Sequence, residues 1–234
     1  MLPGVYDKFQ YWGEQTVWIY SDPHFGDREL RDGIPDRPDD QEQIRRINAK
    51  VGKKDTLIIL GDVGDLDCVR QLRAGRKILI MGNHDSGASN YKRKTVKRVF
   101  DQEEYTEKEA YQFVKNLYPY HQITVDEEYT FHTPFMRYNV YSDNKLFDEV
   151  YEGPLMIGEK LILSHEPLDT PWAYNIHGHI HEGKMWTNHL NVCADVIGYE
   201  PINLNQLLKS GLTSGVQTIH RDTIDKATKR KRGN

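Results

Sequence analysis

The segment Asn175-Ile176-His177-Gly178-His179-Ile180-His181 places three histidines at alternating positions. Successive side chains of a strand point to opposite faces, so this spacing predicts three imidazoles in one row on one face. The glycine between the first two histidines lets the backbone turn or approach another segment closely. Because imidazole is a common metal ligand, the row predicts one side of a metal site whose other ligands lie elsewhere in the chain.

Four further segments share a pattern in which a short apolar run ends in polar residues. Continuous apolar runs bounded by Gly or Pro are typical of strands that are buried on both faces of a helix-covered sheet. The usual site of chemistry in open α/β sheets lies beyond the carboxyl ends of the strands, so the five segments predict one shared site. The runs and the segments that follow them are Val17–Tyr20 with Ser21–His24, Thr56–Leu60 with Gly61–Asp65, Lys77–Met81 with Gly82–Asp85, and Lys160–Leu163 with Ser164–Pro167.

These segments resemble the sequence blocks of the calcineurin-like metallophosphoesterases, in the family's order. The blocks D-x-H, G-D-x-x-D, G-N-H-D/E, H and G-H-x-H are matched by Asp22 and His24, Gly61-Asp62 with Asp65, Gly82-Asn83-His84-Asp85, His165, and Gly178-His179 with His181. The resemblance spans residues 17 to about 205. It implies an α/β fold, a layered α-β-β-α sandwich of two packed sheets flanked by helices, in a small member of the bacterial, archaeal or phage type.

The resemblance also implies two divalent metal ions held by seven ligands. The ligands expected at one ion are Asp22, His24 and His181, those at the other are Asn83, His165 and His179, and Asp62 bridges the two. A bridging carboxylate can hold two cations about 3.5–4 Å apart. Nitrogen and oxygen donors without thiolate suit Mn, Fe, Zn or Ni, with Mn favoured in assays. His177 precedes the family block, and whether it is a further ligand stays open.

The expected activity is metal-dependent hydrolysis of phosphate esters, with phosphodiesters preferred over monoesters. A hydroxide bridging two cations is available near neutral pH and can attack phosphorus in line with the leaving oxygen. His84 stands in the family's general-acid position, where it would protonate that oxygen. An imidazole acting as an acid needs an orienting carboxylate, and Asp65 and Asp85 are both candidates, of which we favour Asp65. The alternatives are a structural His84 and an Asp85 that only stabilises a turn.

Two other functions remain open. A nuclease acting on nucleic-acid ends would need a basic groove, and the sequence offers Tyr91–Arg98, which is otherwise a solvated helix face. A non-catalytic protein-binding module on the same fold is a different class of function. Such relatives typically lack the acid histidine, whereas His84 and all seven expected ligands are present here.

Length and composition predict a single cytoplasmic domain over residues 1–234. A chain of 234 residues with 38% hydrophobic content can bury a sizeable core, and its net charge of −4 gives no global attraction to nucleic acid or acidic lipid. The sequence shows no apolar stretch of membrane-spanning length and no signal segment. Cys68 and Cys193 lie outside the ligand blocks, which favours free thiols in a reducing compartment over a disulfide between them. The oligomeric state is not predicted.

The segments outside the blocks complete the expected organisation. Residues 1–15 are expected as an irregular lead-in, 26–38 as a loop, about 120–153 as a variable insertion, and 226–234 as a disordered basic tail. Helices are predicted after the capping residues Asp39 and Thr106, and short ones near Cys68–Leu72 and Leu204–Leu208. Within the insertion, the candidates for substrate contact are His132, Arg137 and Tyr138, which otherwise cover a sheet edge.

Overall fold

The computed structural model describes residues 16–85, 94–99, 107–117, 121–125, 135–142, 146–158, 160–183 and 186–216. The chain divides into two compact units, residues 1–86 with 147–234, and residues 87–146. The expected lead-in at residues 1–15 and the basic tail at 226–234 lie outside the described residues.

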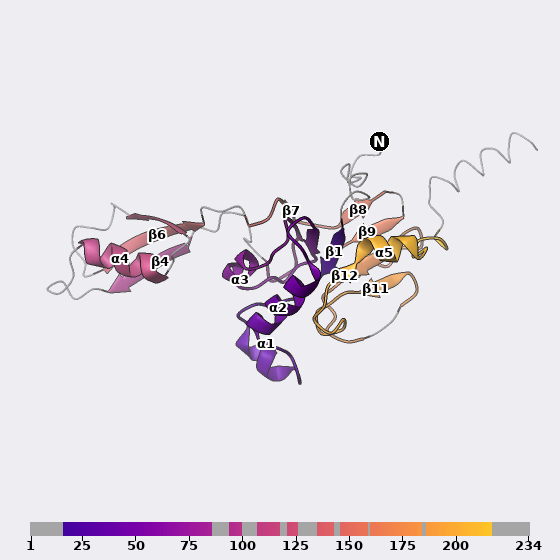
Figure 1. Ribbon diagram of the computed structural model, residues 1–234, viewed down its shortest axis with the longest axis horizontal. Helices are drawn as coiled ribbons and strands as arrows, with labels where there is room; N and C mark the ends of the chain where they lie inside the picture. The colour runs from indigo at the N-terminus through magenta and orange to yellow at the C-terminus, as the bar shows by residue number, and fades with distance from the viewer. Residues whose placement is uncertain are drawn as a thin grey trace, which may run out of the picture. The chain divides into compact units, whose positions relative to one another are not determined.

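A five-stranded sheet with the order β12-β1-β2-β3-β7 carries the first three ligand segments (Figure 1). Strands β1, β2, β3 and β7 run parallel, and β12 pairs antiparallel with β1. Ile19 pairs with Ile58, which pairs with Ile78, so the segments that follow β1, β2 and β3 all leave the same edge of the sheet. The strands are β1 (Val17–Tyr20), β2 (Thr56–Ile59), β3 (Arg76–Ile80), β7 (Glu149–Tyr151) and β12 (Ile202–Asn203).

A four-stranded sheet with the order β11-β10-β9-β8 carries the remaining ligand segments. Strands β9, β10 and β11 are parallel, and β8 pairs antiparallel with β9. Strand β11 ends at Asn191, and beyond it the chain forms an isolated bridge between Cys193 and Ser21. This bridge joins the end of β1 to the chain that follows β11. The strands are β8 (Leu155–Ile157), β9 (Leu161–Leu163), β10 (Tyr174–His177) and β11 (His189–Asn191).

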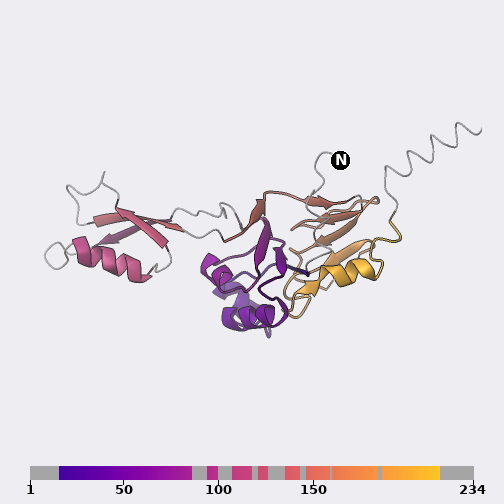
Figure 2. The same cartoon turned by 45° about the horizontal axis from the view of Figure 1, so that its top comes forward.

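The main core is formed by apolar side chains that the two sheets share. Alternate residues point to one face of a strand, and the alternate positions Val17 and Ile19 of β1 belong to the same buried cluster as Leu161 and Leu163 of β9. Tyr20 is also fully buried, and its hydroxyl donates a hydrogen bond of 3.1 Å to Gln43 in a helix. Helices flank the sheets (Figure 2), so the predicted α/β architecture of two sheets with flanking helices is confirmed.

The helices of this unit follow their capping signals. Asp39 caps α2 by accepting a hydrogen bond from the Glu42 amide at 2.8 Å, and Ile44 and Ile47 are buried as predicted. The expectation of a plain loop over residues 26–38 is wrong, because Asp27 caps a short helix, α1. None of the helices in the described ranges is long and apolar enough to span a membrane. The helices are α1 (Arg28–Gly33), α2 (Asp40–Lys50), α3 (Leu66–Arg70) and α5 (Leu204–Lys209).

The second unit contains an antiparallel sheet with the order β4-β6-β5 and the helix α4 (Glu107–Leu117). Its strands are β4 (Lys94–Val99), β5 (His121–Val125) and β6 (Phe135–Ser142). The described part of the basic run Tyr91–Arg98 is therefore a strand and not a helix face. Arg137 and Tyr138 lie in β6, whereas His132 is outside the described residues. The stretch 120–153 contributes strands to both units, since β7 belongs to the first.

Candidate metal centre

The loops after β1 and β2 hold their ligands in an unusual backbone conformation. Asp22, His24 and Asp62 have φ values of 56°, 46° and 52°, in the left-handed region that side-chain-bearing residues seldom adopt. Two backbone hydrogen bonds hold these loops together, from Asp22 N to Gly61 O at 3.2 Å and from His24 N to Asp62 O at 3.0 Å. Strained conformations of this kind persist where the surrounding structure enforces them, and they cluster at functional sites.

Two glycines of the motifs are required for close approach between segments. A Cβ at Gly178 would lie 1.9 Å from Ser21 Oγ and 2.2 Å from Asp22 Oδ2. A Cβ at Gly82 would lie 2.2 Å from Asp62 Oδ1. Any side chain at either position would therefore push a candidate ligand out of place.

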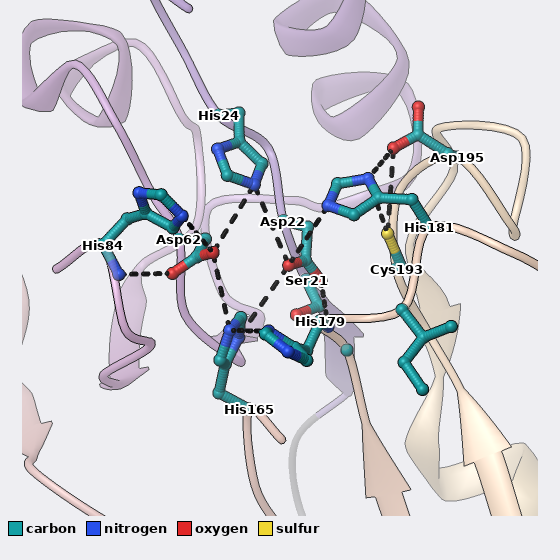
Figure 3. Close-up of polar contacts among 12 residues, drawn as sticks. Ser21, Asp22, His24, Asp62, His84, His165, His179, His181, Cys193 and Asp195 are labelled. Carbon is teal, nitrogen blue, oxygen red and sulfur yellow. Dashed lines mark hydrogen bonds and ion pairs between the residues drawn. The ribbon is translucent and has the colours of Figure 1, made fainter. Parts of the chain in front are cut away.

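Asp62 lies between two groups of imidazoles (Figure 3). Its Oδ2 is 3.5 Å from His24 Nε2 and 3.4 Å from His165 Nε2. Its Oδ1 accepts a hydrogen bond of 3.0 Å from the His84 amide. One oxygen is thus fixed by the backbone, while the other faces both groups of histidines.

The first group of candidate ligands is Asp22, His24 and His181. Asp22 Oδ1 lies 4.0 Å from the Nε2 atoms of both histidines. Within the described part of the chain, Asp22 Oδ1 and His24 Nε2 are buried and have no hydrogen-bond partner. Leaving such atoms unpaired is costly, and a cation between them would satisfy both, so these residues fit a metal ion. Burial lowers the pKa of His24, against the opposing effect of Asp62 and Asp22, and the neutral imidazole keeps a lone pair for a metal.

The second group is Asn83, His165 and His179. His165 Nε2 lies 2.8 Å from Asn83 Oδ1 and 3.1 Å from His179 Nδ1. The other nitrogen, His165 Nδ1, lies 2.8 Å from the Leu60 carbonyl oxygen and therefore carries the proton. The lone pair of Nε2 then points toward Asn83 and His179, which makes this second group a fit for a metal ion as well.

Three side chains that sequence analysis missed support His181. Asp195 Oδ2 lies 2.5 Å from His181 Nδ1, and Asp195 also accepts hydrogen bonds from Arg37 and from the Tyr199 hydroxyl. The Asp195 hydrogen bond raises the pKa of His181. Although burial acts to raise the pKa of Asp195, hydrogen bonds from His181 and Tyr199 and the charge of Arg37 hold that pKa well below its ordinary value. The available signal was the carboxylate of Asp195, which follows the apolar residues Val192 to Ala194 in the sequence.

His84 lies at the exposed side of the centre. Its side chain is 67% exposed, its Nε2 is 4.0 Å from Asp62 Oδ2, and its ring centroid is 5.5 Å from that of His24. The two carboxylates expected beside it have other partners: Asp65 caps α3 through the Asp67 amide. The second of these carboxylates, Asp85, accepts hydrogen bonds from three backbone amides, those of Asp62, Val63 and Gly82. In the described residues neither carboxylate bonds the His84 imidazole, so the orienting role stays a prediction.

The expectation that three histidines form one row is wrong for His177. Strand β10 ends at this residue, and the φ of 66° at His179 shows that the extended conformation does not continue. The buried His177 ring packs instead against His189 and Trp186, with ring centroids 5.4 and 5.8 Å away. The alternation of side chains along a strand therefore cannot be extended past Gly178, and His177 is in none of the metal-ligand groups found among the described residues.

Both cysteines are buried free thiols. Cys193 lies nearer to the centre than its sequence position suggests, with Sγ 3.6 Å from His181 Nδ1. Burial, with the negative charge of Asp22, raises the pKa of this thiol far above its ordinary value, which keeps it protonated. A protonated thiol is a poor metal ligand, because the thiolate is the form that binds metals.

In the described residues, atoms of His, Cys and Asp side chains meet in three groups, and within each group they lie within 4.8 Å of one another. The groups are Asp22 with His24 and Asp62, Asp62 with His165 and His179, and Asp22 with His181 and Cys193. Asp62 and Asp22 each belong to two of them. Overlapping groups that share a carboxylate at the carboxyl ends of strands suit a centre of two metal ions.

Comparison with known proteins identifies the class. Residues 15–197 match the sequence model of the calcineurin-like phosphoesterases. The chain belongs to this family of phosphoesterases, and its candidate ligand groups fit metal ions.

Two known proteins are similar to this chain, one over part of its length and the other over most of it. Gene 66 protein of Mycobacterium phage L5 is 40% identical over an alignment of 83 residues that covers 30% of this chain and 40% of that protein. The match therefore spans less than half of the phage protein. A crystal structure of AQ665, a protein of unknown function from Aquifex aeolicus, superposes with a TM-score of 0.49 and 19% identity over 83% of this chain and 98% of that one.

Proposed function

We propose that this protein hydrolyses phosphodiesters at a dinuclear metal centre in which Asp62 bridges the two ions. The observation that carries the proposal is the position of Asp62 Oδ2, 3.5 Å from His24 Nε2 and 3.4 Å from His165 Nε2. A single carboxylate oxygen that faces histidines of two separate groups suits a bridging ligand. The unpaired buried atoms Asp22 Oδ1 and His24 Nε2 support a cation in the first group.

The chain would contribute ligands, positioning and a proton to the reaction. When bound, two divalent ions activate water and stabilise the charge of the phosphoryl group. Asp22, His24 and His181 would hold one ion, and Asn83, His165 and His179 the other. His84 would donate a proton to the leaving oxygen, and its exposed ring at the edge of the centre is accessible to a substrate.

The charges around the centre favour a diester over a monoester. A monoester dianion carries one more negative charge and benefits from a cationic side chain. Arg37 is the arginine that contacts the ligand loops in the described residues, and it is engaged by Asp195. A cavity of about 290 Å³ beside Asn83 and His165 is lined by Glu152 and Glu166, whose carboxylates repel additional negative charge.

A substrate panel tests this proposal. With Mn²⁺ at equal metal loading, kcat/KM should be higher for bis-p-nitrophenyl phosphate than for p-nitrophenyl phosphate, and a cyclic nucleotide and single-stranded DNA complete the panel. A higher kcat/KM for the monoester would reverse the preference. DNA as the best substrate would favour the nuclease alternative. Two bound metals without turnover of any ester would favour the non-catalytic module.

A further inference from the structure

We propose that Asp195 and Arg37 make the Asp22–His24–His181 group the tighter of the two metal positions, so that it fills first. This inference rests on the proposed division of ligands between two ions. It assigns positioning roles to two residues outside the ligand set. It also predicts which metal position fills first, which the identity of the ligands alone does not determine.

The first step of the argument is the hydrogen bond between Asp195 and His181. The bond joins Asp195 Oδ2 to His181 Nδ1 at 2.5 Å, while His181 Nε2 faces Asp22 Oδ1 at 4.0 Å. A carboxylate that accepts the Nδ1 proton fixes the tautomer and the ring orientation, and it makes the opposite nitrogen a stronger donor. The Tyr199 hydroxyl donates to Asp195 Oδ1 at 2.6 Å and holds the carboxylate in place.

The second step is that Arg37 ties two ligand-bearing segments together. Its Nη1 donates to Asp195, at 2.6 Å to Oδ1 and 2.5 Å to Oδ2. Its Nη2 donates to the backbone oxygens of Asp22 at 3.1 Å and Pro23 at 2.8 Å. The side chains of Arg37 and Asp195 are only 1% and 4% exposed, so solvent screens this connection weakly. The Arg37 guanidinium thus fixes the position of the loop that carries Asp22 and His24 relative to the carboxylate that orients His181.

In the part of the chain that the structure describes, no carboxylate supports the histidines of the second group in the way that Asp195 supports His181. His165 Nδ1 bonds a neutral acceptor, the Leu60 carbonyl oxygen, at 2.8 Å. Two of its three ligands, Asn83 and His179, are exposed, while His165 is buried. In the first group Asp22 is fully buried, and the side chains of His24 and His181 are 10% and 27% exposed. Ordering exposed side chains at the moment of binding costs conformational entropy that preorganised ligands have already lost. The same kind of ion should therefore bind more weakly in the second group.

The test is isothermal titration of the metal-free protein with Mn²⁺. The wild-type chain should show two classes of site, of which His24→Ala removes the tight class and His179→Ala the weak class. Asp195→Asn should weaken the tight class by about 10–100-fold, the usual effect of losing a partner of a metal-binding histidine, and leave the weak class within about twofold. The control is Asp55→Asn, since the Asp55 side chain bonds Gly52 and Trp18 away from the ligand loops.

A second variant distinguishes a selective loss of metal affinity from misfolding. Asp195→Asn leaves the buried Arg37 charge without its partner, so the double variant Arg37→Gln/Asp195→Asn replaces the ion pair by two amides. It should show the same selective loss of the tight class. A single class of sites in the wild-type protein, an equal loss in both classes, or a loss confined to the weak class would overturn the inference. Failure of the proposed hydrolysis would appear separately, as absent turnover with both classes filled.

Discussion

Asp85 accepts hydrogen bonds from the backbone amides of Asp62, at 2.7 Å, and of Val63, at 2.9 Å. The residue that follows His84 in the sequence therefore fixes the loop of the proposed bridging ligand and does not bond the imidazole beside it. A third bond, from Gly82 N at 2.8 Å, closes the turn that carries Asn83. One buried carboxylate thus sets the relative position of ligand segments from β2 and β3.

This relationship predicts that the main effect of Asp85→Asn is a lower free energy of unfolding, and not a change in the rate of the reaction. One carboxylate oxygen becomes an NH₂ group that faces a backbone amide, and leaving a buried amide unpaired costs about 1–3 kcal/mol. Urea unfolding should show this loss. If stability is unchanged and the rate falls only for poor leaving groups, Asp85 orients His84 after all. Asp65→Asn, which keeps a side-chain oxygen that can cap α3, should then show no such rate pattern.

Asp62→Asn should lower metal content and activity together. The substitution removes the negative charge between two proposed cations while nearly preserving the shape of the side chain. Metal content can be measured by inductively coupled plasma mass spectrometry after gel filtration. The matched control is Cys193→Ser, which should leave metal content unchanged because the thiol stays protonated. Two ions retained in Asp62→Asn would rule out the bridging assignment.

His84→Ala should keep both metals and lose about 10²–10⁴-fold in rate, the usual range for a positioned general acid. The loss should depend on the leaving group. Nitrophenolate departs readily without a proton, whereas the alkoxide of a nucleoside requires one, so the defect should be much larger for a dinucleotide than for a nitrophenyl ester. Loss of metal, or an equal slowing of both esters with metals in place, would make His84 a structural or phosphate-positioning residue.

Both thiols should be inert in the folded protein. Burial, together with the nearby carboxylate of Asp65, raises the pKa of Cys68 to about 12, and burial raises the pKa of Cys193 further. The reactive form is the thiolate, which becomes abundant only as the pH rises toward the raised pKa. Ellman's reagent at pH 8 should therefore react rapidly with almost no thiol in the native chain and with two thiols after denaturation. Rapid labelling of native Cys68 would contradict its burial.

The sequence predicted the parts of the centre that are encoded locally. An apolar run that ends in Gly-Asp or Ser-Asp is visible within ten residues, and parallel pairing then brings such ends to one edge of the sheet. The prediction that His177 shares a face with His179 and His181 was wrong. It assumed an extended chain, and the left-handed conformation of His179 breaks that geometry. The contact of Arg37 with Asp195 joins positions 158 residues apart, and nothing near Arg37 in the sequence marks it as a partner. Such contacts depend on tertiary packing.

The bridge between Ser21 and Cys193 has a consequence for the order of folding. The first candidate ligand follows this bridge at Asp22, whereas the carboxylate that supports His181 lies at position 195. During synthesis from the N-terminus, the first ligands leave the ribosome long before their partners, and contacts between residues so distant in sequence form slowly. A nascent chain can therefore complete the centre only after residue 195 has emerged, long after the synthesis of Asp22 and His24, so metal capture must wait for the later segments.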